Sequence, residues 1–309
     1  MSLRQMEYFL TVVEESSFTR AAELLHVTQS ALSHQIRALE RETGGALLER
    51  LPRGVRLTPM GRAFLPHAER AVHSAAQARR AARAAAGATG GELHVATVHA
   101  IAVGLLPEVF ADWSREHGGV RLVLHEYATV EELRDRLERG VADLAVGYRP
   151  RGWRGPVVGV GEEEIVLVVP RGDPLAGRRT VALAELAGRP WVRCAMEPLV
   201  DGRLLLDVAC EKAGFTPRTA VRTEHTSTAL RMAAAGTGIT LVPAHLTAGV
   251  DCATARLDPP WRREVTVFSR VPLAGAAAAF AGLLRQRSGA PLPAGARGRG
   301  AGRAAAPGC

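Results

Sequence analysis

The chain has 309 residues, a formal net charge of +8 at pH 7, 47% hydrophobic residues and 23% charged residues. This composition is typical of a globular protein of two or three domains and excludes a fully disordered chain. No apolar run reaches the roughly 18 residues that span a bilayer, and Arg4, Gln5 and Glu7 interrupt the first ten residues, which excludes an export signal. We therefore expect a cytoplasmic protein without membrane contact.

The positive charge is concentrated at the two ends of the chain. Residues 1–90 contain twelve arginines against eight acidic residues, residues 91–287 are nearly neutral, and residues 288–309 add three more arginines. A basic N-terminal block before a neutral remainder is typical of a nucleic-acid module joined to a domain that does not touch nucleic acid. An ordinary solvated surface would have the same total charge, so the charge alone leaves both interpretations open.

Three amphipathic helices are predicted at the N-terminus. Ser2 and Gln5 form a capping box before the first helix, Ser17 or Thr19 caps a short second helix, and Thr28 caps the third. A tight turn joins the second and third helices, and the third has an apolar stripe on one face. Small polar, amide and basic side chains lie off that stripe, a chemistry suited to DNA in the major groove. The predicted DNA-binding residues on this helix are Thr28, Gln29, Ser30, Ser33, His34 and Arg37.

Two short strands around a Pro-Arg-Gly turn follow and form a basic wing. Arg53 at its tip is placed to enter a minor groove or meet a phosphate, unless it is an ordinary exposed turn residue. Thr58 and Pro59 then start a long helix that runs towards Gly87, about 40 Å at 1.5 Å per residue. One face of this helix carries small residues, so it either pairs with a second copy of the chain or lies on its own domain.

The order of residues in this segment is itself informative. It runs Ser17-Phe18-Thr19-Arg20-Ala21-Ala22-Glu23-Leu24-Leu25, then Val27-Thr28-Gln29-Ser30-Ala31-Leu32-Ser33, and closes with Leu57-Thr58-Pro59-Met60-Gly61. Over about 65 positions it strongly resembles the winged helix-turn-helix of LysR-type transcriptional regulators. His34 departs from the arginine frequent in that family. The resemblance implies a dimer or tetramer that binds an interrupted inverted repeat of double-stranded DNA near promoters, associates with the nucleoid through that DNA, and has RNA polymerase as a partner.

Strands and helices alternate through the next two hundred residues. A first set covers strands 93–96, 120–126 and 143–147, and a second set covers strands 165–169, 191–193 and 239–242, with helices 203–213 and 228–235. A last strand, 265–269, and a helix, 276–285, return to the first set. The alternation predicts parallel sheets, and two α/β lobes with crossovers near Gly161 and Glu264 would leave a cleft for a small ligand.

Short motifs extend the resemblance to about residue 287. They are Leu105-Leu106-Pro107, Asp143-Leu144-Ala145-Val146-Gly147, Ala213-Gly214-Phe215 and Ala234-Ala235-Gly236-Thr237-Gly238-Ile239. They are similar to the LysR effector domain, which implies the Rossmann-like α/β fold of type 2 periplasmic binding proteins. The expected domains are an all-α winged helix-turn-helix (1–58), a linker and dimerisation helix (59–88), an effector-binding domain (lobe I 89–161 and 265–287, lobe II 162–264) and a disordered tail rich in Gly, Ala, Arg and Pro (288–309).

The resemblance also implies which residues hold the small-molecule effector. They are Thr97, His99, Ala100, Ile101 and Thr129 in lobe I, and Met196, Glu197, Thr226 and Ser227 in lobe II. Helix N-termini at Ala100, Thr129 and Thr226 would bring N–H groups and hydroxyls together, which suits a carboxylate or another small anion. The alternative is that each threonine only caps its helix and that His99 is a surface residue.

Cysteines suggest one alternative function. Cys210 falls where the peroxide-sensing subclass of the family has its resolving cysteine, but the position of the reactive thiol is Asp201. A buried helix cysteine is favoured over a Cys194–Cys210 pair.

Other protein classes fit less well. Gly236 and Gly238 precede a strand and lack the context of a dinucleotide site, and no catalytic set or metal-ligand spacing is found, so we expect no enzyme, cofactor or metal ion. Adjacent strand residues point to opposite faces, so the run 162–164 of three glutamates is predicted to be solvated. The wing argues against a periplasmic solute-binding protein, and an architectural DNA-binding protein would need no ligand cleft.

Overall fold

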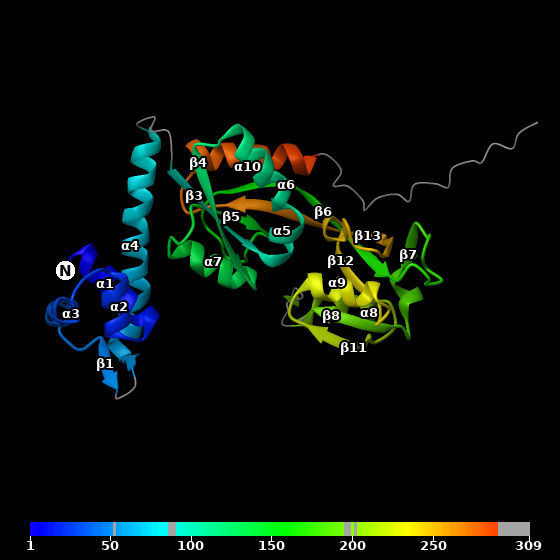
Figure 1. Cartoon of the computed structure of the whole chain (residues 1–309). Coiled ribbons are helices and arrows are strands. Elements are labelled where there is room, and N and C mark those ends of the chain that lie inside the picture. Colours follow the sequence, from blue (N-terminus) through cyan, green and yellow to red (C-terminus); the bar gives the residue numbers. More distant parts are fainter. Residues whose placement is uncertain (52–53, 86–90, 195–198, 201–202, 290–309) are drawn as a thin grey trace, which may run out of the picture. The chain divides into compact units, whose positions relative to one another are not determined.

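The computed structural model describes residues 1–51, 54–85, 91–194, 199–200 and 203–289 (Figure 1). The chain divides into two compact units. The first unit comprises Met1–His94, Gly119–Val123 and Arg134–Asp143, and the second comprises the other segments. None of the helices in the described part has both the length and the apolar character needed to cross a membrane.

The N-terminal elements follow the predicted winged helix-turn-helix. They are α1 (Leu3–Glu15), α2 (Phe18–Leu24), α3 (Gln29–Thr43), β1 (Leu48–Leu51) and β2 (Gly54–Leu57). The capping box of Ser2 and Gln5 is confirmed in both directions, and Thr28 caps α3 by accepting from the Ala31 N–H. Ser17, and not Thr19, caps α2. Each cap satisfies a helix N–H that would otherwise lack a partner, which fixes where these helices begin.

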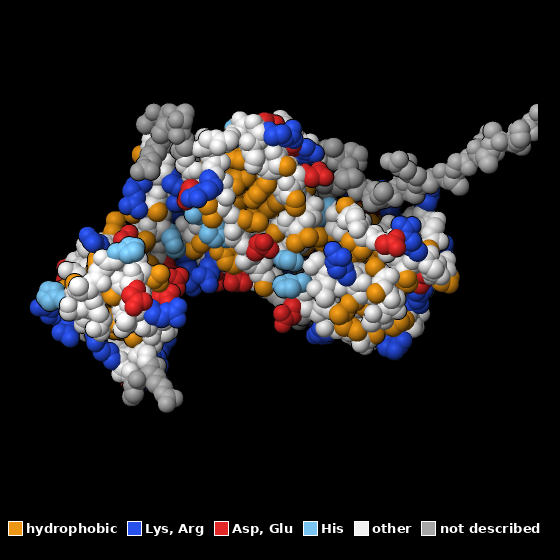
Figure 2. Space-filling model, in the orientation of Figure 1, with side chains coloured by type: hydrophobic (Ala, Val, Ile, Leu, Met, Phe, Trp, Pro, Cys, Tyr) orange, Lys and Arg blue, Asp and Glu red, His pale blue; other side chains and the backbone are white. Residues whose placement is uncertain are grey.

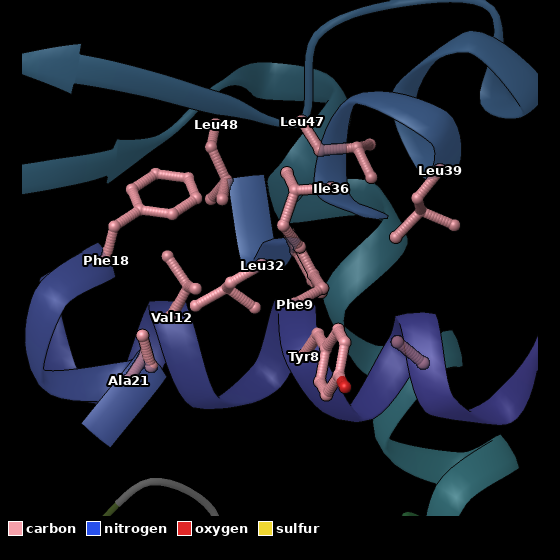
Figure 3. Packing of buried hydrophobic residues seen from close by; sticks show 12 residues of the cluster. Tyr8, Phe9, Val12, Phe18, Ala21, Leu32, Ile36, Leu39, Leu47 and Leu48 are labelled. Carbon is pink, nitrogen blue, oxygen red and sulfur yellow. The ribbon is translucent and has the colours of Figure 1, made fainter. Parts of the chain in front are cut away.

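One apolar core holds these helices and the wing together. Figure 3 shows side chains of α1, α2, α3 and β1 packed against one another, among them Phe9, Leu32 and Ile36, each 2% exposed or less. Phe9 also contacts Phe64 of the next helix edge to face, with ring centroids 5.3 Å apart. The first turns of the long helix therefore belong to the same core as the winged domain.

That long helix is α4 (Pro59–Ala85), and it starts as predicted. The Thr58 hydroxyl accepts from the Gly61 N–H at 3.0 Å, and Pro59 occupies the first turn, where a missing N–H costs nothing. The helix continues through Pro66 without a break in the assigned element. Its pairing with a second copy stays a prediction.

Further along, α4 is fastened to the segment 134–143 within the first unit. Arg139 Nη1 lies 2.9 Å from Glu69 Oε2, and Arg80 Nη2 lies 2.8 Å from Asp143 Oδ1. His73 Nδ1 adds a contact of 3.1 Å to the Arg139 carbonyl. Part of the linker helix thus contacts residues 134–143 of the same chain through polar side chains.

The effector region contains β3 (Gly91–Val98), α5 (His99–Gly104), α6 (Leu106–Glu116), β4 (Val120–Tyr127), α7 (Val130–Glu138), β5 (Leu144–Gly147), β6 (Val157–Val169), β7 (Thr180–Ala182), η1 (Leu183–Leu186), β8 (Pro190–Cys194), β9 (Leu199–Val200), β10 (Arg203–Leu204), α8 (Leu205–Lys212), β11 (Arg218–Thr223), α9 (Thr226–Ala234), β12 (Thr240–Pro243), η2 (Ala244–Thr247), β13 (Ala253–Phe268) and α10 (Gly275–Gly289). Two helices, α5 and α6, lie between β3 and β4, and the polar strand β11 was not predicted.

The prediction of parallel sheets is confirmed for some strand pairs, such as β8 with β11, but the main sheet is mixed. The main sheet has the order β12-β6-β13-β5-β3-β4, in which β3 and β5 are parallel but β13 is antiparallel to both β5 and β6. The predicted strands 165–169 and 265–269 are only the ends of β6 and β13, which have 13 and 16 residues. These two long strands run side by side in opposite directions through both predicted crossover points, so one antiparallel pair connects the two lobes (Figure 1).

The prediction of a solvated glutamate run is wrong at its central residue. Glu163 has a fully buried side chain, whereas Glu162 is 63% exposed beside Arg262 and Glu164 is 19% exposed beside Arg256. The alternation of strand side chains was expected, but here it turns the middle carboxylate inward.

Charged and polar partners surround the buried carboxylate of Glu163. Arg263, its register partner on β13, donates through Nε at 2.7 Å, Tyr148 donates its hydroxyl at 2.9 Å, and His245 Nε2 lies at 3.0 Å. The Arg263 guanidinium stacks on the Tyr148 ring at 3.5 Å. Burial raises the pKa of Glu163, but the hydrogen bond from His245 and the charge of Arg263 outweigh burial and leave that pKa below its ordinary value. The carboxylate is therefore ionised within the antiparallel pair of β6 and β13.

We expect Glu163→Gln to lower the free energy of unfolding by about 3 kcal/mol at pH 7, because it leaves Arg263 without its buried counter-charge. Since folding lowers this pKa, the stabilisation is fully present above the unfolded value of about 4.3 and is lost as the pH falls through the folded value. In thermal unfolding between pH 3 and 7, the melting temperatures of the wild type and of Glu163→Gln should converge at the acid end. Glu162→Gln is the exposed control, and equal melting temperatures of both variants at pH 7 would contradict the assignment.

Candidate nucleic-acid interface and effector site

The N-terminal half of α3 presents most of the predicted DNA-binding residues to solvent. Thr28, Gln29, Ser30, His34 and Arg37 are all exposed. The Thr28 hydroxyl caps α3 and also lies 3.1 Å from the Ser30 hydroxyl. A helix that offers hydroxyl, amide, imidazole and guanidinium groups together can contact both base edges and phosphates.

Ser33 differs from these residues because it is 6% exposed. Its hydroxyl accepts a hydrogen bond from Arg50 Nη2 at 2.6 Å. Ser33 therefore lies among the buried residues of α3, and the sequence gave no sign that a wing residue covers it. Arg53, predicted at the wing tip, lies outside the described residues.

Charge on the wing and α2 is partly neutralised within the domain. Arg56 and Glu49 face each other across β1 and β2 with an N–O distance of 2.7 Å, and Arg20 pairs with Glu15 at 3.1 Å. On the face seen in Figure 2, basic and acidic side chains are interspersed over this domain. The net charge of the segment therefore does not form one continuous basic surface on that face.

His99 is the centre of the predicted effector site. It begins α5, its Nε2 lies 3.1 Å from the Ser227 hydroxyl on α9, and its Nδ1 lies 3.1 Å from Glu126 Oε2 on β4. Its ring also lies against that of His225, with centroids 4.5 Å apart. The structure thus brings His99 of lobe I, Ser227 of lobe II and the Glu126 carboxylate together.

Other predicted effector residues lie in different surroundings. Thr97 is fully buried and donates its hydroxyl to the Val146 carbonyl at 2.8 Å, and Ile101 is a fully buried core residue. Ala100 packs at the edge of an apolar cluster of the second lobe. Thr129 caps α7 by accepting from the Glu132 N–H at 3.0 Å.

Thr226 does not cap α9 with its side chain. It is the first residue of α9, and its hydroxyl lies 3.7 Å from the sulfur of Cys194, which in turn contacts the Glu224 carbonyl at 3.1 Å. Met196 and Glu197 lie outside the described residues.

In the described part of the chain, Cys194, Cys210 and Cys252 form no disulfide bond. Cys210 is fully buried in α8, among Trp191, Leu206 and other apolar side chains, so its prediction as a buried helix cysteine is confirmed. Cys194 is half-buried. Asp201 and Cys309 lie outside the described residues. Within the described ranges, no group of three or more His, Cys, Asp or Glu side chains has a geometry that could hold a metal ion.

Sequence reasoning missed three residues of these sites, namely Glu126, His225 and Arg50. A signal existed for Glu126, because β3 and β4 are sheet neighbours and both Glu126 and His99 lie where these strands end. Arg50 follows Glu49 and was indistinguishable in sequence from the other wing arginines.

Two family models match the chain. "Bacterial regulatory helix-turn-helix protein, lysR family" matches residues 3–62, and "LysR substrate binding domain" matches residues 86–289. The DNA-binding transcriptional dual regulator OxyR of Escherichia coli K12 is 32% identical over 248 residues, which are 79% of each protein. The HTH-type transcriptional regulator AlsR of Bacillus subtilis is 29% identical over 244 residues, 79% of this chain and 80% of AlsR.

Solved structures share the whole architecture. The crystal structure of full-length CbnR in complex with its target DNA aligns with a TM-score of 0.70 at 28% identity, covering 93% of this chain and 100% of that one. A helical DNA-binding region followed by a mixed α/β effector region of two lobes is common to both, as the sequence predicted.

Proposed function

Because this chain belongs to the LysR family of DNA-binding transcriptional regulators, we propose that it binds an interrupted inverted repeat near promoters and responds to a small anionic metabolite. It acts in the cytoplasm as a dimer or tetramer, with RNA polymerase as a further partner. Residues 1–58 bind DNA, 59–88 join the copies, and 89–287 bind the effector. The observation that carries the effector part is the contact of His99 with Ser227 across the two lobes.

For DNA, the support is the exposed row of α3 together with the wing. Two copies of α3, one from each subunit, would lie in successive major grooves. Gln29 offers both a donor and an acceptor amide group, which is the pattern that recognises adenine, and Arg37 offers a guanidinium for guanine or phosphate.

For the effector, the support is the donor set around His99. The His99 imidazole contacts the Glu126 carboxylate through Nδ1, and its Nε2 faces the neutral hydroxyl of Ser227. A carboxylate of the ligand would replace that hydroxyl and form a stronger, charge-assisted hydrogen bond. Ligand binding would then favour the arrangement of the two lobes in which His99 and the ligand carboxylate are hydrogen-bonded. This shift in arrangement would change how the subunits bend DNA and recruit RNA polymerase.

The DNA assignment is tested by recovering genomic fragments bound by the purified protein at near-physiological salt. Enrichment of a few interrupted palindromes is expected. Gln29→Ala should lose about 1–3 kcal/mol on the recovered site only, whereas Arg53→Ala should weaken the recovered site and a random duplex alike. Equal losses by both variants on both duplexes would contradict these roles.

The effector assignment is tested with a panel of small mono- and dicarboxylates screened by thermal shift. Any carboxylate that stabilises the wild type should bind His99→Gln at least about tenfold more weakly, because the variant lacks the imidazole donor. DNA affinity without ligand should not change. His117→Gln, whose ring stacks on Trp113 at 4.2 Å, is the matched control. Undiminished binding by His99→Gln would remove His99 from the site.

Peroxide sensing is the competing function, since several relatives are named hydrogen peroxide-inducible genes activators. We expect hydrogen peroxide to leave DNA binding unchanged, because Cys210 is enclosed in the core and Asp201 occupies the position of the reactive thiol. Thiol labelling should modify Cys194 in the folded protein and Cys210 only after unfolding. A peroxide-induced Cys194–Cys210 disulfide that alters the DNA footprint would favour the competing function.

A further inference from the structure

Arg50 connects three elements of the DNA-binding domain. It lies on β1 of the wing, its guanidinium stacks on the ring of Phe18 in α2 at 4.2 Å, and its Nη2 donates to Ser33 in α3 at 2.6 Å. Phe18 and Ser33 are 7% and 6% exposed, so both supports are parts of the domain interior. Two independent contacts therefore fix the position of one cation.

This fixed position lies beside the residues expected to contact DNA. Gln29, Ser33 and Arg37 follow one another at intervals of four, which places them in one row along α3. Gln29 and Arg37 are exposed, and the Arg50 guanidinium covers the buried hydroxyl between them. The middle position of the row is thus occupied by an arginine of the wing.

The Arg50 guanidinium also keeps donors available. Arg50 is exposed, and its hydrogen bond to Ser33 uses Nη2, while within the described residues Nε and Nη1 have no hydrogen-bond partner and no carboxylate pairs with the group. Its neighbours Arg56 and Arg20 are each paired with a glutamate. A planar cation with free N–H groups is the side chain best suited to a phosphate.

We propose that Arg50 donates directly to a DNA phosphate and that Ser33 contributes to DNA binding only through Arg50, as a positioning residue. This inference rests on DNA binding by the winged domain. Holding the guanidinium before DNA arrives removes the cost of ordering a long side chain on binding. Because Arg50 is attached to both the wing and α3, one phosphate contact would position both elements on the DNA backbone.

The test measures the salt dependence of DNA affinity for the full-length protein, by fluorescence anisotropy on a duplex recovered by the wild type and on a random duplex. Arg50→Ala should weaken both duplexes by about tenfold or more and reduce the slope of log K against log salt by about 0.9 for each subunit bound. Ser33→Ala should weaken binding less and leave the slope unchanged, because the charge is still present. In the Arg50→Ala background, Ser33→Ala should change nothing further.

Controls separate this role from folding and from total charge. Arg178→Ala removes an arginine of the effector domain that pairs with Glu185, and should leave the slope unchanged. Thermal unfolding checks that each variant is folded. Arg50→Lys keeps the charge without the planar fork and should keep the slope, so it tests the proposal even if Arg50→Ala does not fold. An unchanged slope in a folded Arg50→Ala variant, a reduced slope in Arg50→Lys, or a further loss on adding Ser33→Ala would overturn the proposal. Absence of a preferred duplex would instead refute the proposed operator, and the random duplex would still decide the role of Arg50.

Discussion

The buried carboxylate of Glu163 is the constraint on which the two-lobed effector region depends. It sits where β6 and β13 connect the lobes, and removing a carboxylate from water costs several kcal/mol unless partners compensate for it. Arg263, Tyr148 and His245 supply those partners from three other places in the chain. No relative movement of the lobes can separate this group from its counter-charge at low cost. The pairing of β6 and β13 at this point is therefore held by a buried ion pair as well as by backbone hydrogen bonds.

The contact between His99 and Ser227 is weak by comparison. It joins a partly exposed imidazole to a neutral hydroxyl, and such a bond contributes only about 1 kcal/mol. A ligand can replace it at little cost, whereas it cannot replace the bonds around Glu163. The same contrast holds in the first unit, where α4 shares the apolar core of the winged domain but meets residues 134–143 through polar contacts. A protein can change conformation without unfolding when its apolar cores stay intact and only the polar contacts between them are exchanged.

A structural feature could be predicted from the sequence when the residues that determine it lie close together along the chain, and could not when they lie far apart. Helix starts at Ser2, Thr28 and Thr58 were predictable because each cap lies within three residues of the N–H that it satisfies. The lengths of β6 and β13 were not, because their pairing is interrupted between Arg256 and Trp261, where two prolines hide the strand pattern. The burial of Glu163 was not predictable either, since two of its partners lie 82 and 100 residues further along the chain. The candidate effector site shows the same limit, because the resemblance named His99 and Ser227 but not Glu126 of β4, which contacts His99.

The winged domain shows why net charge is a poor measure of a DNA-binding surface. Arginines paired with glutamates, such as Arg20 and Arg56, bring their counter-charge to the interface and gain less from a phosphate. What distinguishes Arg50 is that its supports are a ring and a hydroxyl, neither of which neutralises it. An aromatic face and a neutral acceptor fix the direction of a guanidinium while leaving its full charge, and the burial of Ser33 follows from that arrangement. The charge that a DNA-binding surface presents therefore depends less on the number of its cations than on whether the groups that hold each cation neutralise it.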